Sequence, residues 1–322
     1  MSNLQKRLTD WTGLSHTTTV TILLVLATGL IYATRYAGDF EELGTSARAL
    51  GMGGSAVALA QGPAAIYYNP ALAARNRRTA ALLLHAEDFS GLVQHNFLGV
   101  SFVAGLQAFG LGLLHNGIPG IKLTTLPDTT KPPGENNRPV VRGVVNANQL
   151  VCYLNYCRIL SSHVSLGGNA KVIYQGLGPS SCFGMGLDGG LVLTPFEDLD
   201  IGLRVRNASS SPLFWTTGTK EFILPRPCLG VSRSVRVGRD ALLVAAEVGA
   251  DPEERSLYHN LGLEYSFRRT LFGRMGLHRG NFTFGLGARY RRFYLDYGYS
   301  AGYAAGSREL GSTQQISGGV EF

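Results

Sequence analysis

The feature that most constrains this chain is an alternation of apolar residues with polar or small ones, which starts after residue 76 and continues to the end. In one such segment Phe282, Phe284 and Leu286 fall on one side, and Thr283 and Gly285 fall on the other. A period of two residues predicts β-strands, because successive side chains of a strand point to opposite faces. We predict fourteen strands, at 77–87, 92–103, 107–115, 145–157, 163–175, 183–193, 199–207, 225–235, 240–250, 257–267, 271–279, 282–290, 293–300 and 312–322.

The predicted connections sort into short turns and generally longer loops that alternate along the chain. The short turns fall around 104–106, 158–162, 194–198, 236–239, 268–270 and 291–292, whereas the longest loops cover 116–144 and 208–224. An even number of strands of about ten residues, with turns at one end and loops at the other, is typical of bacterial outer-membrane barrels. Both termini would then lie on the periplasmic side.

A soluble β-sandwich also alternates apolar and polar faces, but its outer face usually carries many charges. Only 16% of this chain is charged. We therefore predict an all-β, transmembrane antiparallel β-barrel with the apolar face toward lipid and the small or charged residues toward the lumen. The sheet must close into a ring, because lipid offers no partners to unpaired backbone groups.

Residues 1–37 are predicted to form a signal peptide, with cleavage near 33 or 37. Lys6 and Arg7 give a basic start, and an apolar run extends from Val20 to Ala33. A transmembrane anchor is the alternative, but a run of this length rises only about 21 Å as a helix, against a hydrocarbon core of about 30 Å. We expect export to the outer membrane of a diderm bacterium.

Residues 38–76 do not follow the strand pattern, and we predict that they form a plug inside a barrel made by residues 77–322. The segment is rich in small residues, and an Asn-Pro pair within it is a helix start. A nucleotide-binding loop at its glycines is not expected, because no parallel βαβ unit surrounds them. The residues expected to form and anchor the plug are Gly51, Gly53, Gly54, Tyr67, Tyr68, Asn69 and Pro70.

Neither catalysis nor cofactor binding is predicted. Four cysteines occur without a Cys-x-x-Cys pair or histidines at ligand spacing, which argues against a metal site and leaves their disulfide state open. The Gly298-Tyr-Ser300-Ala-Gly302 stretch matches a nucleophile elbow, but no histidine follows His278. The arginines are scattered along the chain, so we expect no nucleic-acid partner.

The alternation places charged side chains on the lumen side, and we expect seven of them to form a polar network. Unpaired charges in a confined lumen are costly, so Glu264 is expected to pair with Arg274, and Arg289 with Asp296. The network would brace the barrel and plug or guide a substrate; both roles remain open. Its members are Asp188, Arg204, Glu247, Glu264, Arg274, Arg289 and Asp296.

The segment Ala47-Arg-Ala-Leu-Gly-Met-Gly-Gly-Ser55 and the later Asn69-Pro70-Ala71 resemble the amino-terminal signature of the PorV/PorQ group of outer-membrane proteins, relatives of the FadL fatty-acid transporters. Gly117-Ile-Pro119, residues 171–190 and the stretch Leu295-Asp-Tyr-Gly-Tyr299 are similar to further parts of that family. The resemblance implies a non-catalytic fourteen-stranded barrel with the amino-terminal segment in its lumen.

The same resemblance implies two functions. The first is a PorV-type partner in protein export or surface attachment by a type IX-like secretion system, with secretion-apparatus proteins or exported substrates bound at the loops 116–144 and 208–224. The alternative is a FadL-like channel for hydrophobic small molecules, with a candidate apolar loop site at Phe214, Trp215, Phe222 and Ile223. Further expected partners are outer-membrane lipid and the barrel-assembly machinery, which would read the carboxy-terminal Phe322.

Overall fold

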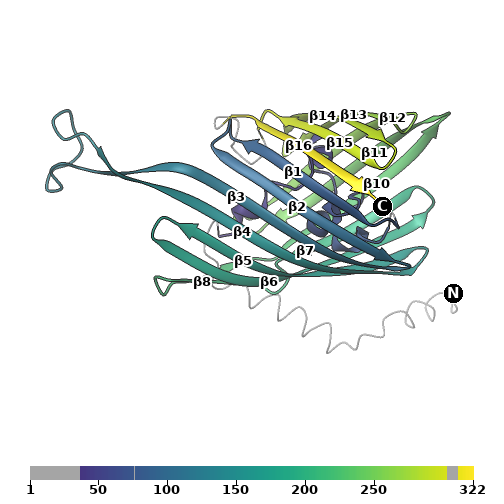
Figure 1. Cartoon of the computed structure of the whole chain (residues 1–322), viewed down its shortest axis with the longest axis horizontal. Helices are drawn as coiled ribbons and strands as arrows, with labels where there is room; N and C mark the ends of the chain where they lie inside the picture. The colour runs from purple at the N-terminus through teal and green to yellow at the C-terminus, as the bar shows by residue number, and fades with distance from the viewer. Residues whose placement is uncertain (1–36, 76, 303–310) are drawn as a thin grey trace, which may run out of the picture.

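The computed structural model describes residues 37–75, 77–302 and 311–322, and shows a barrel of antiparallel strands (Figure 1). Consecutive wall strands pair with one another, and β16 pairs with β1 to close the ring, which confirms the predicted fourteen-stranded barrel. The wall strands are β1 (Ala80–Asp88), β2 (Val93–Ala104), β3 (Gln107–Thr125), β4 (Val140–Ser161), β5 (Val164–Leu177), β6 (Ser180–Phe196), β7 (Leu199–Arg206), β10 (Arg226–Val237), β11 (Asp240–Asp251), β12 (Ser256–Phe267), β13 (Leu271–His278), β14 (Asn281–Tyr290), β15 (Phe293–Ser300) and β16 (Thr313–Glu321).

The outer surface of the wall is apolar, as the alternation predicts. Within the wall, the strands alternate between buried, lumen-facing residues and exposed, outward-facing ones, and the outward ones are mainly aliphatic or aromatic. One exposed apolar residue from each of the fourteen strands illustrates this face: Leu83, Leu98, Leu111, Leu154, Val172, Met185, Leu203, Leu229, Val244, Leu261, Met275, Phe284, Leu295 and Ile316.

A charge on the outward face is expected to destabilise the barrel in proportion to its depth. Leu286 lies in the middle of β14 and Tyr290 at its end, and they are 65% and 70% exposed. Arginine at the bilayer midplane costs about 2–4 kcal/mol, but only about 0–1 kcal/mol near the interface. Urea unfolding in lipid vesicles should therefore show a large loss for Leu286→Arg and a small one for Tyr290→Arg. Equal losses would contradict the placement of this face in lipid.

The two ends of the barrel differ, and we name them by their connections. The short-turn end holds the turns 105–106, 162–163, 197–198, 238–239, 268–270 and 291–292, and the opposite end is the long-loop end. At the long-loop end β3 and β4 project well beyond the wall (Figure 1). The loop is therefore shorter than the predicted 116–144, because both ends of that range belong to strands. β3 and β4 pair on both sides of Pro119 and Gly120, with a register shift between Ile118 and Ile121. Proline and glycine are uncommon inside strands, so the sequence did not indicate this extension.

The loop predicted at 208–224 contains a further hairpin, made of β8 (Ser211–Trp215) and β9 (Lys220–Ile223). The chain leaves the wall after β7, with Asn207 and Ser210 at positive φ, and β8 then resumes pairing with β6 at Gly184. The hairpin adds two strands to the sheet but lies outside the closed ring.

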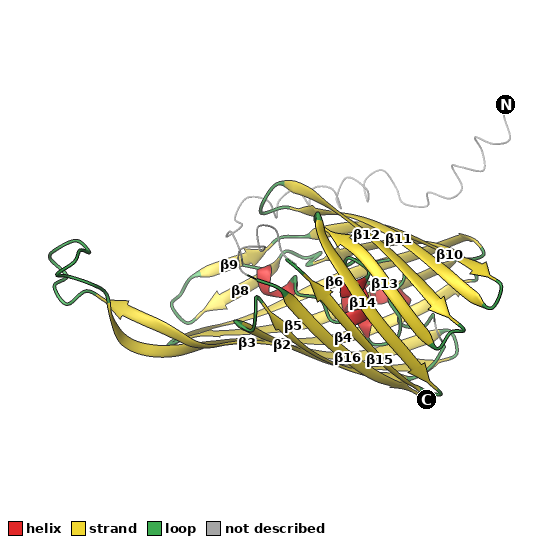
Figure 2. Ribbon diagram, turned by 90° about the horizontal axis from the view of Figure 1, so that it is seen from above, coloured by secondary structure: helices red, strands yellow, loops and turns green. Residues whose placement is uncertain are grey.

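The amino-terminal segment contributes four short helices: η2 (Asp39–Glu41), α3 (Ala47–Gly51), α4 (Ala64–Tyr68) and η3 (Pro70–Leu72). They are enclosed by the strands (Figure 2). Among the described residues no helix is long and apolar enough to cross a membrane. The predicted signal peptide lies outside the described residues, apart from Ala37.

Candidate functional site

The amino-terminal segment packs directly on the inner wall, where the strands carry glycine. Gly51 meets Gly285, and the Ala47 amide donates to the Ser317 Oγ at 3.2 Å. A side-chain carbon on any of six wall glycines would collide with the segment, so the absence of side chains allows the two backbones to meet. These glycines are Gly167, Gly190, Gly202, Gly262, Gly276 and Gly298.

The residues predicted to form and anchor the plug lie at these contacts. Gly53 and Gly54 have φ of +66° and +79° and turn the chain beside β12 and β13. The Tyr67 and Tyr68 hydroxyls accept from the amides of Gly44 and Thr45 at 3.2 and 3.1 Å. The Asn69 Oδ1 caps η3 by accepting from the Ala71 amide, its Nδ2 donates to the Val57 carbonyl at 2.8 Å, and Pro70 is the first residue of η3.

A fully buried ion pair joins the segment to the wall at Lys171 on β5. Its Nζ lies 2.6 Å from the Glu41 Oε1 of the segment and 3.1 Å from the Asp188 Oδ1 on β6. The Asn207 Nδ2 donates to the second Glu41 oxygen at 2.8 Å. The sequence reasoning placed Asp188 in the lumen but missed Lys171, which the alternation along β5 would have found. Glu41 lies in a segment without periodicity and gave no signal.

A second group of charges lies on β12 to β15. The Glu264 carboxylate accepts both Nε and Nη2 of Arg48, each at 2.8 Å, and Nε of Arg274 at 2.6 Å. The expected pair of Glu264 with Arg274 is therefore present, and Arg48 of α3 completes it. The segment and the wall share one carboxylate at this point.

The expected pair of Arg289 with Asp296 is wrong. Asp296 binds the Arg274 Nη1 at 2.7 Å, whereas Arg289 binds Glu321 at 2.5 Å. The register explains the exchange, because Asp296 lies opposite Gly287, which leaves room for the Arg274 side chain to cross β14. Sequence alone does not reveal this gap.

The remaining lumen charges hold the segment through its backbone. Arg204, itself 2% exposed, donates to the Tyr68 carbonyl at 3.2 Å, and Glu247 accepts the amides of Ala56 and Val57 at 3.0 and 3.1 Å. Charge-assisted hydrogen bonds of this kind are stronger than neutral ones. These contacts give the network a bracing role between the segment and the barrel.

Near the long-loop end, Glu42 of the segment is surrounded by arginines. It pairs with Arg206 at 3.1 Å, with Arg226 at 3.0 Å and with Arg279 at 3.4 Å. Burial alone would raise the pKa of Glu42, but the three guanidinium groups together hold that pKa well below its ordinary value. Glu42 therefore stays charged at neutral pH and binds the segment to β7, β10 and the turn after β13.

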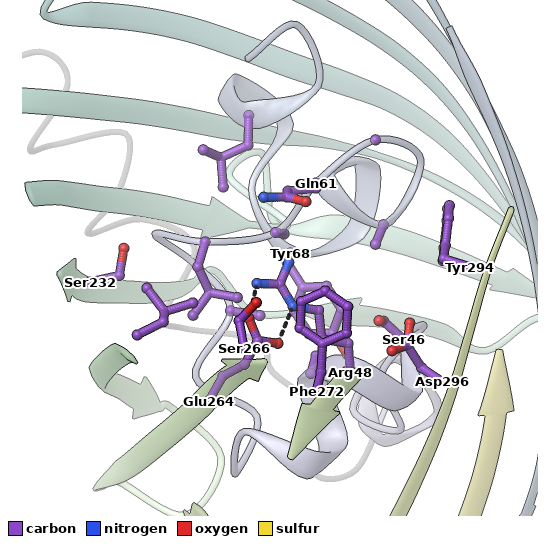
Figure 3. Close-up of a pocket in the computed structure, with 18 of the residues that line it drawn as sticks. Ser46, Arg48, Gln61, Tyr68, Ser232, Glu264, Ser266, Phe272, Tyr294 and Asp296 are labelled. Carbon is purple, nitrogen blue, oxygen red and sulfur yellow. Dashed lines mark hydrogen bonds and ion pairs between the residues drawn. The ribbon is translucent and has the colours of Figure 1, made fainter. Parts of the chain in front are cut away.

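A cavity of about 490 Å³ lies between the segment and the short-turn end, and we call it the vestibule. Its apolar lining includes Leu59 and Leu72 of the segment and Leu82 of β1. Its polar lining includes Arg48, which binds Glu264 (Figure 3). The described lining contains five arginines and five carboxylates, so it carries no net charge.

The apolar loop site predicted at Phe214, Trp215, Phe222 and Ile223 does not form as one pocket. On the hairpin of β8 and β9, alternation places Phe214 and Phe222 on one face and Trp215 and Ile223 on the other. Phe214 is 46% exposed, whereas Ile223 is buried beside Gly38. The Trp215 Nε1 donates to Glu221 at 2.8 Å.

The four cysteines are free thiols, of which Cys152 is exposed and the other three are buried. In the described part of the chain, no group of three or more His, Cys, Asp or Glu side chains is placed to hold a metal ion.

Solved structures with a similar fold include two toluene transporters. TodX of Pseudomonas putida matches with a TM-score of 0.56 and 12% identity, over 88% of this chain and 99% of that one. TbuX of Ralstonia pickettii matches with a TM-score of 0.55 and 12% identity, over 88% and 98%. The chain has the fold of these transporters. An identity this low establishes the fold and not the cargo.

A FadL homologue of Pseudomonas aeruginosa has the same fold, with a TM-score of 0.51 and 12% identity over 86% of this chain and 98% of that one. No protein-family model and no curated protein sequence matches the chain. The relation to FadL expected from the sequence is therefore supported at the level of fold, and the narrower PorV/PorQ assignment is not.

Proposed function

We propose that this protein is a non-catalytic outer-membrane channel for small hydrophobic molecules. The observation that carries the proposal is the similarity in fold, over almost the whole chain, to two toluene transporters. It favours the FadL-like alternative over a PorV-type role in protein export. With the short-turn end toward the periplasm, the vestibule would be the last compartment before release.

The lining of the vestibule supports an uncharged cargo. Ligand sites for such molecules are mostly apolar, with a few polar groups that fix orientation. Leu59, Leu72 and Leu82 contribute apolar surface, and the charges of the five arginines and the five carboxylates cancel. A lining without net charge has no excess attraction for anions or cations, so it does not select an ion of either sign.

An apolar track leads toward the vestibule along three adjacent strands. Leu114 on β3 lies opposite Phe97 on β2, and Phe97 lies opposite Leu84 on β1, two residues from Leu82 of the vestibule. Ile66 of α4 packs over this track against Gly110 and Gly112. We propose that cargo passes between α4 and this part of the wall when the segment shifts, because apolar contacts can be exchanged for an apolar solute at little cost.

Filling the vestibule is expected to slow uptake severalfold. Leu243 and Val244 are neighbours on β11, but Leu243 lines the cavity and Val244 is on the outward face with 46% exposure. Leu243→Trp places an indole in the vestibule, whereas Val244→Trp places it in lipid. Uptake of labelled toluene by vesicles containing each full-length variant is the measurement. Equal uptake by both variants would remove the vestibule from the path.

A further inference from the structure

The exposed arginines at the short-turn end are concentrated on one half of the barrel. They occur in or beside the three consecutive turns between β10 and β11, β12 and β13, and β14 and β15. The three turns on the other half contain no arginine, although Arg158 lies at an exposed, outward position of β4 beside one of them, and another consists of Glu197 and Asp198. We call the following six residues the basic rim: Arg233, Arg236, Arg239, Arg268, Arg291 and Arg292.

The rim is positive and unneutralised. Among the described residues no carboxylate lies within ion-pair distance of any rim arginine. The one acidic residue in these turns is Asp240, which accepts the Tyr265 hydroxyl at 2.6 Å and the Arg268 amide at 2.8 Å. Asp240 thus binds a hydroxyl and the backbone of the turn, and it makes no ion pair with a rim guanidinium group.

Three rim arginines lie beside the outward apolar face. Arg233 occupies an outward position on β10 between Val231 and Val235, which are 40% and 45% exposed. The guanidinium of Arg268 lies 5.1 Å from the centre of the Phe267 ring, and that of Arg291 lies 5.4 Å from the Tyr290 ring. Both rings belong to the outward face, 44% and 70% exposed, at the ends of their strands.

This position selects a lipid headgroup over a soluble acidic partner. Aromatic residues at strand ends mark the boundary between acyl chains and headgroups. A guanidinium group beside them lies at the level of lipid phosphates, and its planar fork matches a phosphate geometrically. An acidic protein would approach the open end of the barrel and would not reach Arg233 within its apolar row.

We propose that the basic rim binds the phosphate groups of anionic phospholipids in the periplasmic leaflet, so that such lipids gather on one side of the barrel. The remaining rim arginines, Arg236, Arg239 and Arg292, raise the local positive potential. The binding is independent of cargo passage, since Arg269, which lines the vestibule, is not part of the rim.

The test uses the full-length protein in phosphatidylcholine vesicles with a trace of spin-labelled phosphatidylglycerol or spin-labelled phosphatidylcholine. Electron spin resonance measures the fraction of each probe immobilised on the barrel. The wild type is expected to prefer phosphatidylglycerol roughly two- to fivefold, the size expected for an exposed ion pair. Raising the salt concentration should reduce this preference.

The test variant combines Arg233→Gln, Arg268→Gln and Arg291→Gln and should lose most of the preference. The matched control combines Lys131→Gln, Arg138→Gln and Arg142→Gln on the projecting β3–β4 hairpin, which changes the net charge equally and should retain it. Heat-modifiable migration on gels verifies that each variant is an assembled barrel. A wild type without preference, or a preference lost equally in both variants, would overturn the proposal and leave an acidic macromolecule as the partner of the rim.

Discussion

Replacing Lys171 with methionine is expected to release the amino-terminal segment from the wall. The change leaves the carboxylates of Glu41 and Asp188 buried, 2% and 3% exposed at the side chain, without the ammonium group between them. Breaking a buried ion pair by removing one partner costs about 3–5 kcal/mol. We expect lower stability against urea and, in planar bilayers, a higher conductance, because the segment would no longer close the lumen.

Lys131 provides a matched control for this substitution. It pairs with Asp128 at 3.0 Å, but its side chain is 72% exposed at the tip of the projecting hairpin. An exposed pair contributes only about 0–1 kcal/mol, so Lys131→Met should change neither stability nor conductance appreciably. A conductance of Lys171→Met equal to that of the wild type, with its stability reduced, would show that the segment does not block ion flow.

Glu264→Ala, in the lining of the vestibule, is expected to reduce the stability by a similar amount. The substitution removes the carboxylate shared by Arg48 and Arg274, and the Arg274 side chain is only 2% exposed. An arginine left buried with fewer partners should lower the free energy of unfolding by about 3–5 kcal/mol. Glu264→Gln keeps the shape of the side chain and part of its hydrogen bonding, so the loss in the free energy of unfolding should be intermediate.

Glu321 is the corresponding control, because it also bridges two arginines. Its partners Arg78 and Arg289 are 58% and 37% exposed, so water can solvate both when the carboxylate is removed. Glu321→Ala should therefore cost about 0–1 kcal/mol. Urea titrations of the four proteins in the same vesicles provide the comparison. If Glu321→Ala costs as much as Glu264→Ala, burial does not govern the strength of these pairs.

The strands of the wall could be predicted from the sequence because the membrane imposes the pattern. A strand between lipid and a filled lumen has two unlike faces, and this difference appears directly as alternation. The predicted β14, at 282–290, is observed as Asn281–Tyr290. Beyond the membrane both faces meet water, so the outer parts of β3 and β4 carry no such pattern. β8 and β9 have five and four residues, which is too short a stretch to show an alternation clearly.

The lumen side of each candidate residue also followed from alternation, but its partners did not. Alternation places Asp296 and Arg274 inside the barrel. Their pairing depends on the register of three strands and on the space left by the missing side chain of Gly287. The nearest charge in the hairpin, Arg289, was the natural choice from sequence, and the register gives it Glu321 instead.

The sequence by itself determined the barrel, its strand number and the face that each wall residue presents, because these depend on local periodicity. The tertiary structure alone decided how the amino-terminal segment lies in the lumen. Its contacts with Lys171, Arg204 and Glu247 join residues more than a hundred positions apart. Such contacts require both the closed ring and the glycine-lined wall, and no pattern within the segment encodes either of them.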